Sequence, residues 1–240
     1  MVQPDLGRRL TAEAVGTALL VAVVVGSGIF AQRLSPHDQG LQLLENSVAT
    51  GAGLVALILA FGSVSGAHFN PAVSLADRLL GGLTSAELAA YAAAQVTGAC
   101  LGSVAANLMF SLPAVNWSTH SRTGAGLALG ELVATFGLIT IVLGVVRSGR
   151  ATAAPFAVGA YITAAYWFTS STSFANPAVA IGRSLTDTFA GIAPGSLPMF
   201  TVMELVGAVL ATMLARYLHP AIAAENVIVP HRESEPKANP

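Results

Sequence analysis

Six long segments of the chain are apolar and nearly free of charge. They cover residues 10–31, 47–67, 88–112, 127–146, 151–182 and 197–215. The charged residues inside these segments are three glutamates, Glu13, Glu131 and Glu204. A helix crosses the hydrocarbon core of a bilayer with about 20 apolar residues, so each segment can hold one spanning helix. Apolar residues are left over after the second span and in the long fifth segment. The pattern predicts an all-α membrane protein with six spans.

Composition supports this prediction and excludes several other classes. Hydrophobic residues make up 54% of the chain and charged residues 10%, whereas about a quarter of a soluble domain is charged. The formal net charge of −1 gives no basis for a nucleic-acid partner. The single cysteine, Cys100, excludes an intrachain disulfide and a cysteine-rich metal site. Because no nucleophile–base pair or cluster of metal ligands is visible, we expect neither an enzyme nor a bound metal or cofactor.

The distribution of basic residues predicts the orientation in the membrane. Six spans put both termini on one side. With the termini in the cytoplasm, the basic residues that face inward are Arg8, Arg9, Arg78, Arg147, Arg150, Arg216, Arg232 and Lys237. Arg33 and Arg122 then lie in outer loops, in agreement with the positive-inside rule. We expect a multi-pass protein of the inner (plasma) membrane with cytoplasmic termini. The polar segment 221–240 is expected to be a disordered tail.

The sequence contains an internal repeat, with one copy over residues 8–112 and the other over residues 125–219. Three pairs of segments correspond: 13–17 with 131–135, 69–73 with 175–179, and 95–99 with 204–208. In each copy, two spans precede an Asn-Pro-Ala motif and a third span follows it. Three spans is an odd number, so the two copies are expected to sit inverted in the membrane. Inverted repeats with interrupted apolar segments are typical of a site near the bilayer midplane.

The leftover apolar residues after each Asn-Pro-Ala motif predict two half-helices. Pro71 and Pro177 suit the first turn of a helix, where the missing N–H costs nothing. Asn70 and Asn176 are then N-cap residues. Each half-helix is too short to span, so two of them can enter from opposite faces and meet at their N-termini. Irregular backbone at that depth is tolerated where it lines a cavity or is buried in protein, which predicts a central water-filled pore.

Residues 65–73 (Ser-Gly-Ala-His-Phe-Asn-Pro-Ala-Val) resemble the first signature of the aquaporin and aquaglyceroporin family, also called the major intrinsic proteins. Residues 176–178 resemble the second signature, and the resemblance extends over about residues 8–219. It implies one channel domain over residues 1–220, a right-handed bundle of six helices plus two half-helices, and a homotetramer in the lipid bilayer with one pore per subunit. The implied activity is passive permeation of water and small neutral solutes.

The resemblance also assigns roles to particular residues. The pore motifs are Asn70, Pro71, Ala72, Asn176, Pro177 and Ala178. Glu13 and Glu131 are expected to accept hydrogen bonds from the backbone of the re-entrant loops, and the ring of His68 is expected at the inner pore. Each half-helix N-terminus carries about +0.5 of an elementary charge, so two meeting at the midplane oppose cations. The amides of both asparagines can donate hydrogen bonds to a passing oxygen and interrupt a proton-conducting chain of water.

The chain departs from the family at the outer selectivity filter. Most members carry Arg directly after the second Asn-Pro-Ala, and here Val179 takes that position. The other filter positions are Thr50, Ser173 and, in the fifth span, either Tyr166 or Ala164, of which we prefer Tyr166. This set predicts a wider and less charged outer mouth. Glycerol facilitators usually have Asp directly after this Arg, and this chain has Ala180 at that position.

Residues 174–179 and 182–187 resemble a bacterial aquaglyceroporin-like subgroup associated with arsenical detoxification. The resemblance implies permeation of metalloid species such as arsenous acid. Arg183 has two interpretations: it either pairs with Asp187, four residues later, or makes the outer vestibule cationic. Two other functions stay open at this point, namely a secondary transporter with alternating access and an occluded structural membrane protein.

Overall fold

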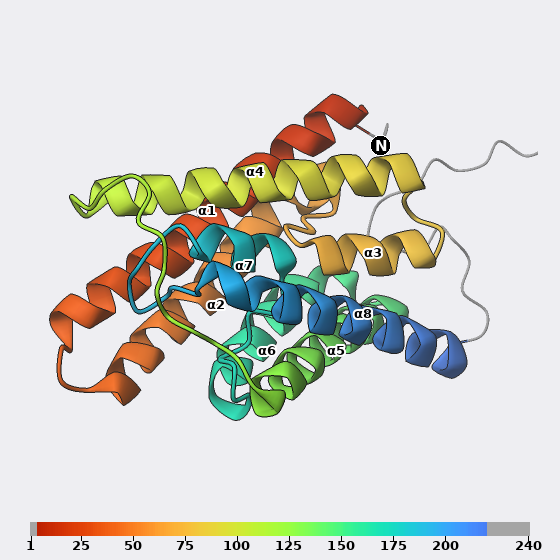
Figure 1. Cartoon of the computed structure of the whole chain (residues 1–240). Coiled ribbons are helices and arrows are strands. Elements are labelled where there is room, and N and C mark those ends of the chain that lie inside the picture. Colours follow the sequence, from red (N-terminus) through yellow and green to blue (C-terminus); the bar gives the residue numbers. More distant parts are fainter. Residues whose placement is uncertain (1–3, 220–240) are drawn as a thin grey trace, which may run out of the picture.

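The computed structural model describes residues 4–219, which fold into a helical bundle (Figure 1). The α-helices within this range are α1 (Leu6–Leu34), α2 (Gln39–Ser65), α3 (Pro71–Leu79), α4 (Ser85–Met109), α5 (Ala125–Arg147), α6 (Ala154–Phe168), α7 (Pro177–Arg183) and α8 (Leu197–Leu218). Two short 3₁₀ turns precede α6 and α8, at Ala151–Ala153 and Pro194–Ser196. The predicted tail over residues 221–240 lies outside the described residues.

Six helices are the predicted spans, and the all-α fold class is confirmed. Five of them, α1, α2, α4, α5 and α8, are long and apolar enough to cross a membrane. The sixth, α6, has 15 residues and follows directly on a 3₁₀ turn. The fifth uncharged segment is longer than one span because it holds α6, an irregular loop and the short helix α7. The second span is likewise followed by a loop and the short helix α3.

The two copies of the repeat form two similar groups of helices. In the first copy α1 packs against α2 and α4, and in the second α5 packs against α6 and α8. Contacts between α2 and α6 join the groups. Each short helix reaches across: α3 contacts α8 of the other copy, and α7 contacts α4 (Figure 1). The short helices therefore lie where the two copies meet.

Two glycines allow α1 and α4 to approach closely. A Cβ atom on Gly98 would lie 2.2 Å from the carbonyl oxygen of Ala14, and one on Gly102 would lie 2.2 Å from that of Ala18. Small residues four apart are typical of tightly packed membrane helices, where van der Waals contact replaces the hydrophobic effect. This close packing fixes the position of Glu13 on α1 relative to Gln95 on α4.

Candidate functional site

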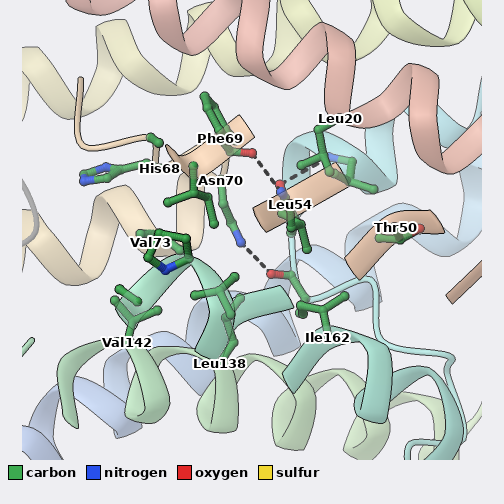
Figure 2. Close-up of a pocket in the computed structure, with 18 of the residues that line it drawn as sticks. Leu20, Thr50, Leu54, His68, Phe69, Asn70, Val73, Leu138, Val142 and Ile162 are labelled. Atoms are coloured by element: carbon green, nitrogen blue, oxygen red, sulfur yellow. Dashed lines mark hydrogen bonds between the residues drawn. The ribbon is translucent and has the colours of Figure 1, made fainter. Parts of the chain in front are cut away.

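A cavity of about 610 Å³ lies between the two copies of the repeat. Most of its wall is hydrophobic and comes from α1, α2, α5 and α6, with Leu20, Val24, Leu54, Ile58, Leu138, Val142, Val158 and Ile162. Both re-entrant loops and both motif asparagines complete the lining. Figure 2 shows Asn70 in the middle of this wall, with Leu20, Leu54, Leu138 and Val142 around it. The cavity is thus mainly apolar, with polar groups on the re-entrant segments and at Thr50 and Tyr166.

The two motif asparagines are the N-caps of the short helices. Asn70 has an extended backbone (φ −156°, ψ 118°), and its Oδ1 accepts a hydrogen bond from the Ala72 amide at 2.8 Å. Asn176 has nearly the same conformation (φ −162°, ψ 106°), and its Oδ1 accepts from the Ala178 amide at 3.0 Å. Each helix then begins at the proline, as the missing N–H of proline favours.

Each asparagine also donates a hydrogen bond to the opposite copy of the repeat. Asn70 Nδ2 donates to the carbonyl oxygen of Ala175 at 2.7 Å, and Asn176 Nδ2 donates to that of Phe69 at 2.8 Å. Figure 2 shows these crossed bonds as dashed lines. An amide nitrogen carries two N–H groups, so one on each asparagine has no acceptor among the described residues. These two donors line the cavity at the junction of the half-helices.

The loops before the asparagines hold a strained backbone. Phe69 and Ala175, whose carbonyls accept the crossed bonds, both have φ of 50°. Ala67 and Ser173, two residues earlier, have φ of 49° and 52°. Residues with a Cβ rarely adopt this left-handed region, so each such position costs about 1–3 kcal/mol and needs compensating contacts. The alternation keeps both loops out of helical conformation until the asparagine is reached.

Buried glutamates supply the compensating contacts. In the first copy, Glu13 accepts from the backbone amides of His68 at 3.0 Å and Phe69 at 2.7 Å. Its carboxylate also accepts from Ser65 Oγ and from Gln95 Nε2. In the second copy, Glu131 accepts from the amides of Phe174 at 2.9 Å and Ala175 at 2.7 Å.

In each copy, a residue of the third span lies near the loop-supporting glutamate, and this residue differs between the copies. Gln95 fills this place in the first copy, and Glu204 fills it in the second. Glu204 accepts from the Asn176 amide at 2.9 Å, and its second carboxyl oxygen is buried with no hydrogen-bond partner among the described residues. The carboxyl groups of Glu131 and Glu204 lie close together, and two carboxyl groups that share a buried site disfavour ionisation of both. The correspondence of Gln95 with Glu204 in the repeat predicted polar packing for Glu204 but not its proximity to Glu131.

Hydroxyl groups cluster at one end of the cavity, which is the outer end in the orientation predicted from the basic residues. The hydroxyl oxygens of Thr50 and Tyr166 lie 3.1 Å apart, and both residues line the cavity. Ser173 and Val179 line the same end, and Ser173 Oγ is buried without a hydrogen-bond partner among the described residues. The structure places Ala164 on the outer surface of α6, away from the cavity. One wall of this end is therefore polar, and Val179 leaves it without a cation at the position after the motif.

The pairing of Arg183 with Asp187 predicted from their spacing is wrong. Helix α7 ends at Arg183, so Asp187 lies beyond the helix and the two residues do not share a helical face. Asp187 instead accepts from the backbone amide of Thr119 at 2.8 Å and from its hydroxyl at 3.0 Å. Arg183 lines the cavity and donates from Nε to the carbonyl oxygen of Ala190. The stacking of Arg183 on Phe174, at 3.5 Å from guanidinium carbon to ring centre, had no signal in the sequence.

His68 lies on the side of the cavity formed by α3. Its Nδ1 is 3.0 Å from Ser74 Oγ, and its Nε2 is buried with no partner among the described residues. His68 belongs to the residues that line the cavity, but its Nε2 atom is itself covered by the protein. Within residues 4–219, no three metal-ligating side chains come together to form a metal site.

Comparisons with known proteins give one result. Residues 1–185 match the family described as Major intrinsic protein. The chain is 56% identical over 218 residues to the aquaglyceroporin AqpS of Rhizobium meliloti (strain 1021), covering 91% of this chain and 93% of that protein. It is 31% identical to aquaporin Z of Brucella melitensis biotype 1, over 86% of this chain and 95% of that protein.

The fold matches a solved structure as well. The X-ray structure of the aquaglyceroporin from Plasmodium falciparum superposes with a TM-score of 0.73, covering 90% of this chain and 98% of that chain at 20% identity. The chain therefore belongs to the major intrinsic protein family and is a multi-pass membrane channel, not an enzyme, that passes water and small solutes passively.

Proposed function

We propose that this channel carries uncharged solutes of about glycerol size, including metalloid species such as arsenous acid, in addition to water. The observation that carries the proposal is the outer end of the cavity, where Val179 replaces the arginine that narrows and charges most members of the family. The resemblance of residues 174–187 to the arsenical-associated subgroup supports the metalloid assignment. Arsenous acid is uncharged at neutral pH and similar in size to glycerol.

The chemistry of the outer end suits such solutes. Thr50 and Tyr166 place hydroxyl groups along one wall, and Ser173 lines the same end with its hydroxyl group buried. Apolar side chains from α1, α2, α5 and α6 form the remainder of the passage. A solute with several hydroxyl groups can exchange its hydrogen bonds with water for bonds to this polar wall while its carbon or metalloid face contacts the apolar side. Pore diameter and lining donors are the main determinants of selectivity in such channels.

The midplane supplies the proposed barrier to cations. The N-termini of α3 and α7 meet there, and each contributes about half an elementary positive charge. The free N–H of Asn70 and of Asn176 can orient the oxygen of a passing solute toward the junction. A water molecule held in this way cannot continue a proton-conducting chain on both sides.

Assembly and orientation are part of the same proposal. Family membership supports a homotetramer with one pore in each subunit. Most of the basic residues near span ends belong to the end of the bundle that carries the termini, which supports cytoplasmic termini in the inner (plasma) membrane. Native mass spectrometry of the purified protein tests the tetramer, and protease accessibility of the termini in spheroplasts tests the orientation.

The decisive experiment is stopped-flow permeability of reconstituted protein. Liposomes containing the channel are compared with empty liposomes for water, glycerol, urea and arsenous acid at equal lipid composition. We expect permeability above the empty control for water, glycerol and arsenous acid, with flux that rises linearly with concentration. Water flux accompanied by exclusion of every larger neutral solute would contradict the proposal.

A further inference from the structure

The side chain of Arg183 is almost fully enclosed at the outer end of the cavity. It is 2% exposed and belongs to the residues that line the cavity, at the last position of α7. A charged side chain enclosed to this degree is rare in proteins unless it is paired or has a function. Its position one helical turn beyond Val179 puts it next to the proposed filter.

Two contacts hold the guanidinium group in place. Nε donates to the carbonyl oxygen of Ala190, and the guanidinium carbon lies 3.5 Å from the centre of the Phe174 ring. Phe174 is itself fixed by an edge-to-face contact with Phe200, with ring centres 5.0 Å apart. The planar guanidinium therefore lies on a rigid aromatic surface, an arrangement that favours arginine over lysine.

The remaining nitrogens of Arg183 are without protein acceptors. Nη1 and Nη2 keep accessible surface and have no hydrogen-bond acceptor among residues 4–219. Glu131 and Glu204 are the acidic groups near Arg183, and their carboxyl groups accept from the re-entrant backbone. Asp187 accepts from Thr119 instead. The two Nη groups together carry four N–H donors.

A second arginine adds positive charge at the same place. The guanidinium carbon of Arg122 lies 5.2 Å from the centre of the Phe174 ring, and its Nε donates to the carbonyl oxygen of Gly191. Phe174 thus contacts two guanidinium groups, each anchored to a backbone carbonyl in the segment after α7. Two guanidinium groups therefore lie at the outer mouth although position 179 is apolar.

We propose that Arg183 is a specificity-determining residue of the outer mouth, which binds the oxygen atoms of hydroxylated neutral solutes through its Nη groups. The inference rests on the proposed function and identifies the residue that selects its solutes. Stacking on Phe174 moves the cation to the side of the passage, so the mouth keeps a directional donor and stays wide enough for glycerol. The outer mouth then selects solutes by the geometry of its hydrogen-bond donors and not by a small diameter.

The test compares water and glycerol permeability of liposomes containing wild type, Arg183→Met or Arg183→Lys at equal density of folded protein. Arg183→Met keeps much of the side-chain volume and loses all donors, and the glycerol-to-water ratio should fall about tenfold, as expected for one charge-assisted hydrogen bond. Arg183→Lys keeps the charge and loses the planar pair of Nη groups, so its ratio should lie between those of wild type and Arg183→Met.

Arg33→Met is the matched control. Arg33 also lies over a phenylalanine, 5.1 Å from the centre of the Phe110 ring, and donates to the Phe110 carbonyl oxygen, but it does not line the cavity. The glycerol-to-water permeability ratio of Arg33→Met should equal that of wild type. If Arg183→Met fails to fold, Phe174→Leu removes the stacking surface and should lower the ratio in the same way.

Three results would overturn the inference: an unchanged ratio in folded Arg183→Met, proportional loss of both fluxes, or an equal change in Arg33→Met. Failure of the proposed function is distinguishable, because wild-type protein would then conduct no glycerol at all.

Discussion

The hydroxyl oxygens of Thr50 and Tyr166 lie 3.1 Å apart at the outer end of the cavity. The two residues come from α2 and α6, which belong to different copies of the repeat. Their contact therefore ties the two copies together at the place where solutes enter. It also fixes two hydroxyl groups side by side on the polar wall.

Removal of one of these hydroxyl groups should affect selectivity more than stability. For Tyr166→Phe we expect a loss of about 1 kcal/mol of stability, the usual contribution of one hydrogen bond, and a larger drop in glycerol flux than in water flux. Tyr161→Phe is the control, because Tyr161 on the same helix donates to the Ala134 carbonyl and does not line the cavity. Equal glycerol flux in both variants would show that the Tyr166 hydroxyl takes no part in selection.

Arginine at position 179 should restore a narrow, charged filter. Val179→Arg adds a long cation one turn before Arg183, and like charges four apart on a helix repel modestly. We expect glycerol flux to fall much more than water flux. Val179→Leu adds bulk without charge and separates the two effects. Equal loss of both fluxes in well-folded Val179→Arg would mean that position 179 does not set the size limit.

A carboxylate at the midplane should weaken the cation barrier. Asn176→Asp keeps the oxygen that caps α7 but loses the Nδ2 donor to the Phe69 carbonyl. The unpaired carbonyl should cost about 1–3 kcal/mol of stability. The negative charge should offset the helix dipoles and admit sodium or protons, which dyes enclosed in liposomes report. If the folded Asn176→Asp variant were no more permeable to sodium or protons than wild type, the helix dipoles would not be the barrier to cations.

The two glutamates of the second copy should respond differently to the same substitution. Glu204→Gln can still accept from the Asn176 amide and can donate to Glu131, as Gln95 donates to Glu13. We expect its melting temperature and flux to match wild type. Glu131→Gln replaces one of two oxygens that accept from the Phe174 and Ala175 amides. It should lose about 1–3 kcal/mol of stability and most of its flux. If Glu204→Gln lost more stability than Glu131→Gln, the prediction that a neutral amide can replace the Glu204 carboxyl group would be wrong.

Acid should loosen the outer loop through Asp187. The backbone amide of Thr119, followed by its hydroxyl and nearby His120, holds the pKa of the Asp187 carboxyl below its usual range. A lowered pKa stabilises the folded state above the unfolded pKa of about 3.9, and the effect is lost as the pH falls through the folded value. Asp187→Asn should therefore melt slightly below wild type at pH 7, and the difference should shrink progressively as the pH falls below about 3.9. If the difference in melting temperature persisted unchanged in acid, it would come from packing and not from the charge of Asp187.

Local signals in the sequence were sufficient for much of the fold. Asparagine followed by proline defines the start of α3 and α7 because the cap and the missing N–H act within one turn. The lengths of the uncharged segments located the spans, because a helix needs about 20 consecutive apolar residues to cross the bilayer. The two filter candidates in the fifth span could not be separated by counting, since the loop before Asn176 has an irregular backbone with no fixed rise per residue.

The predictions that were wrong or missing concern contacts that depend on where a helix ends or on how a loop folds back. Arg183 and Asp187 are four apart, but the helix ends between them, and helix ends are hard to locate from sequence. The stacking of Arg183 on Phe174 depends on how the second loop folds back over α7. The partnership of Glu131 with Glu204 joins two helices and was hinted at only by the correspondence of Gln95 with Glu204 in the repeat.

The crossed bonds from Asn70 to Ala175 and from Asn176 to Phe69 bear on how the two copies of the repeat depend on each other. Each copy offers one asparagine amide donor and one carbonyl acceptor. In the structure each donor bonds to the carbonyl of the other copy and not to the carbonyl of its own copy. A single copy would leave both unsatisfied in the middle of a membrane. Two identical copies facing each other across a two-fold axis would satisfy all four groups at once. The geometry therefore suits two half-length chains paired about a two-fold axis, and a single chain that carries both copies holds the pair together permanently.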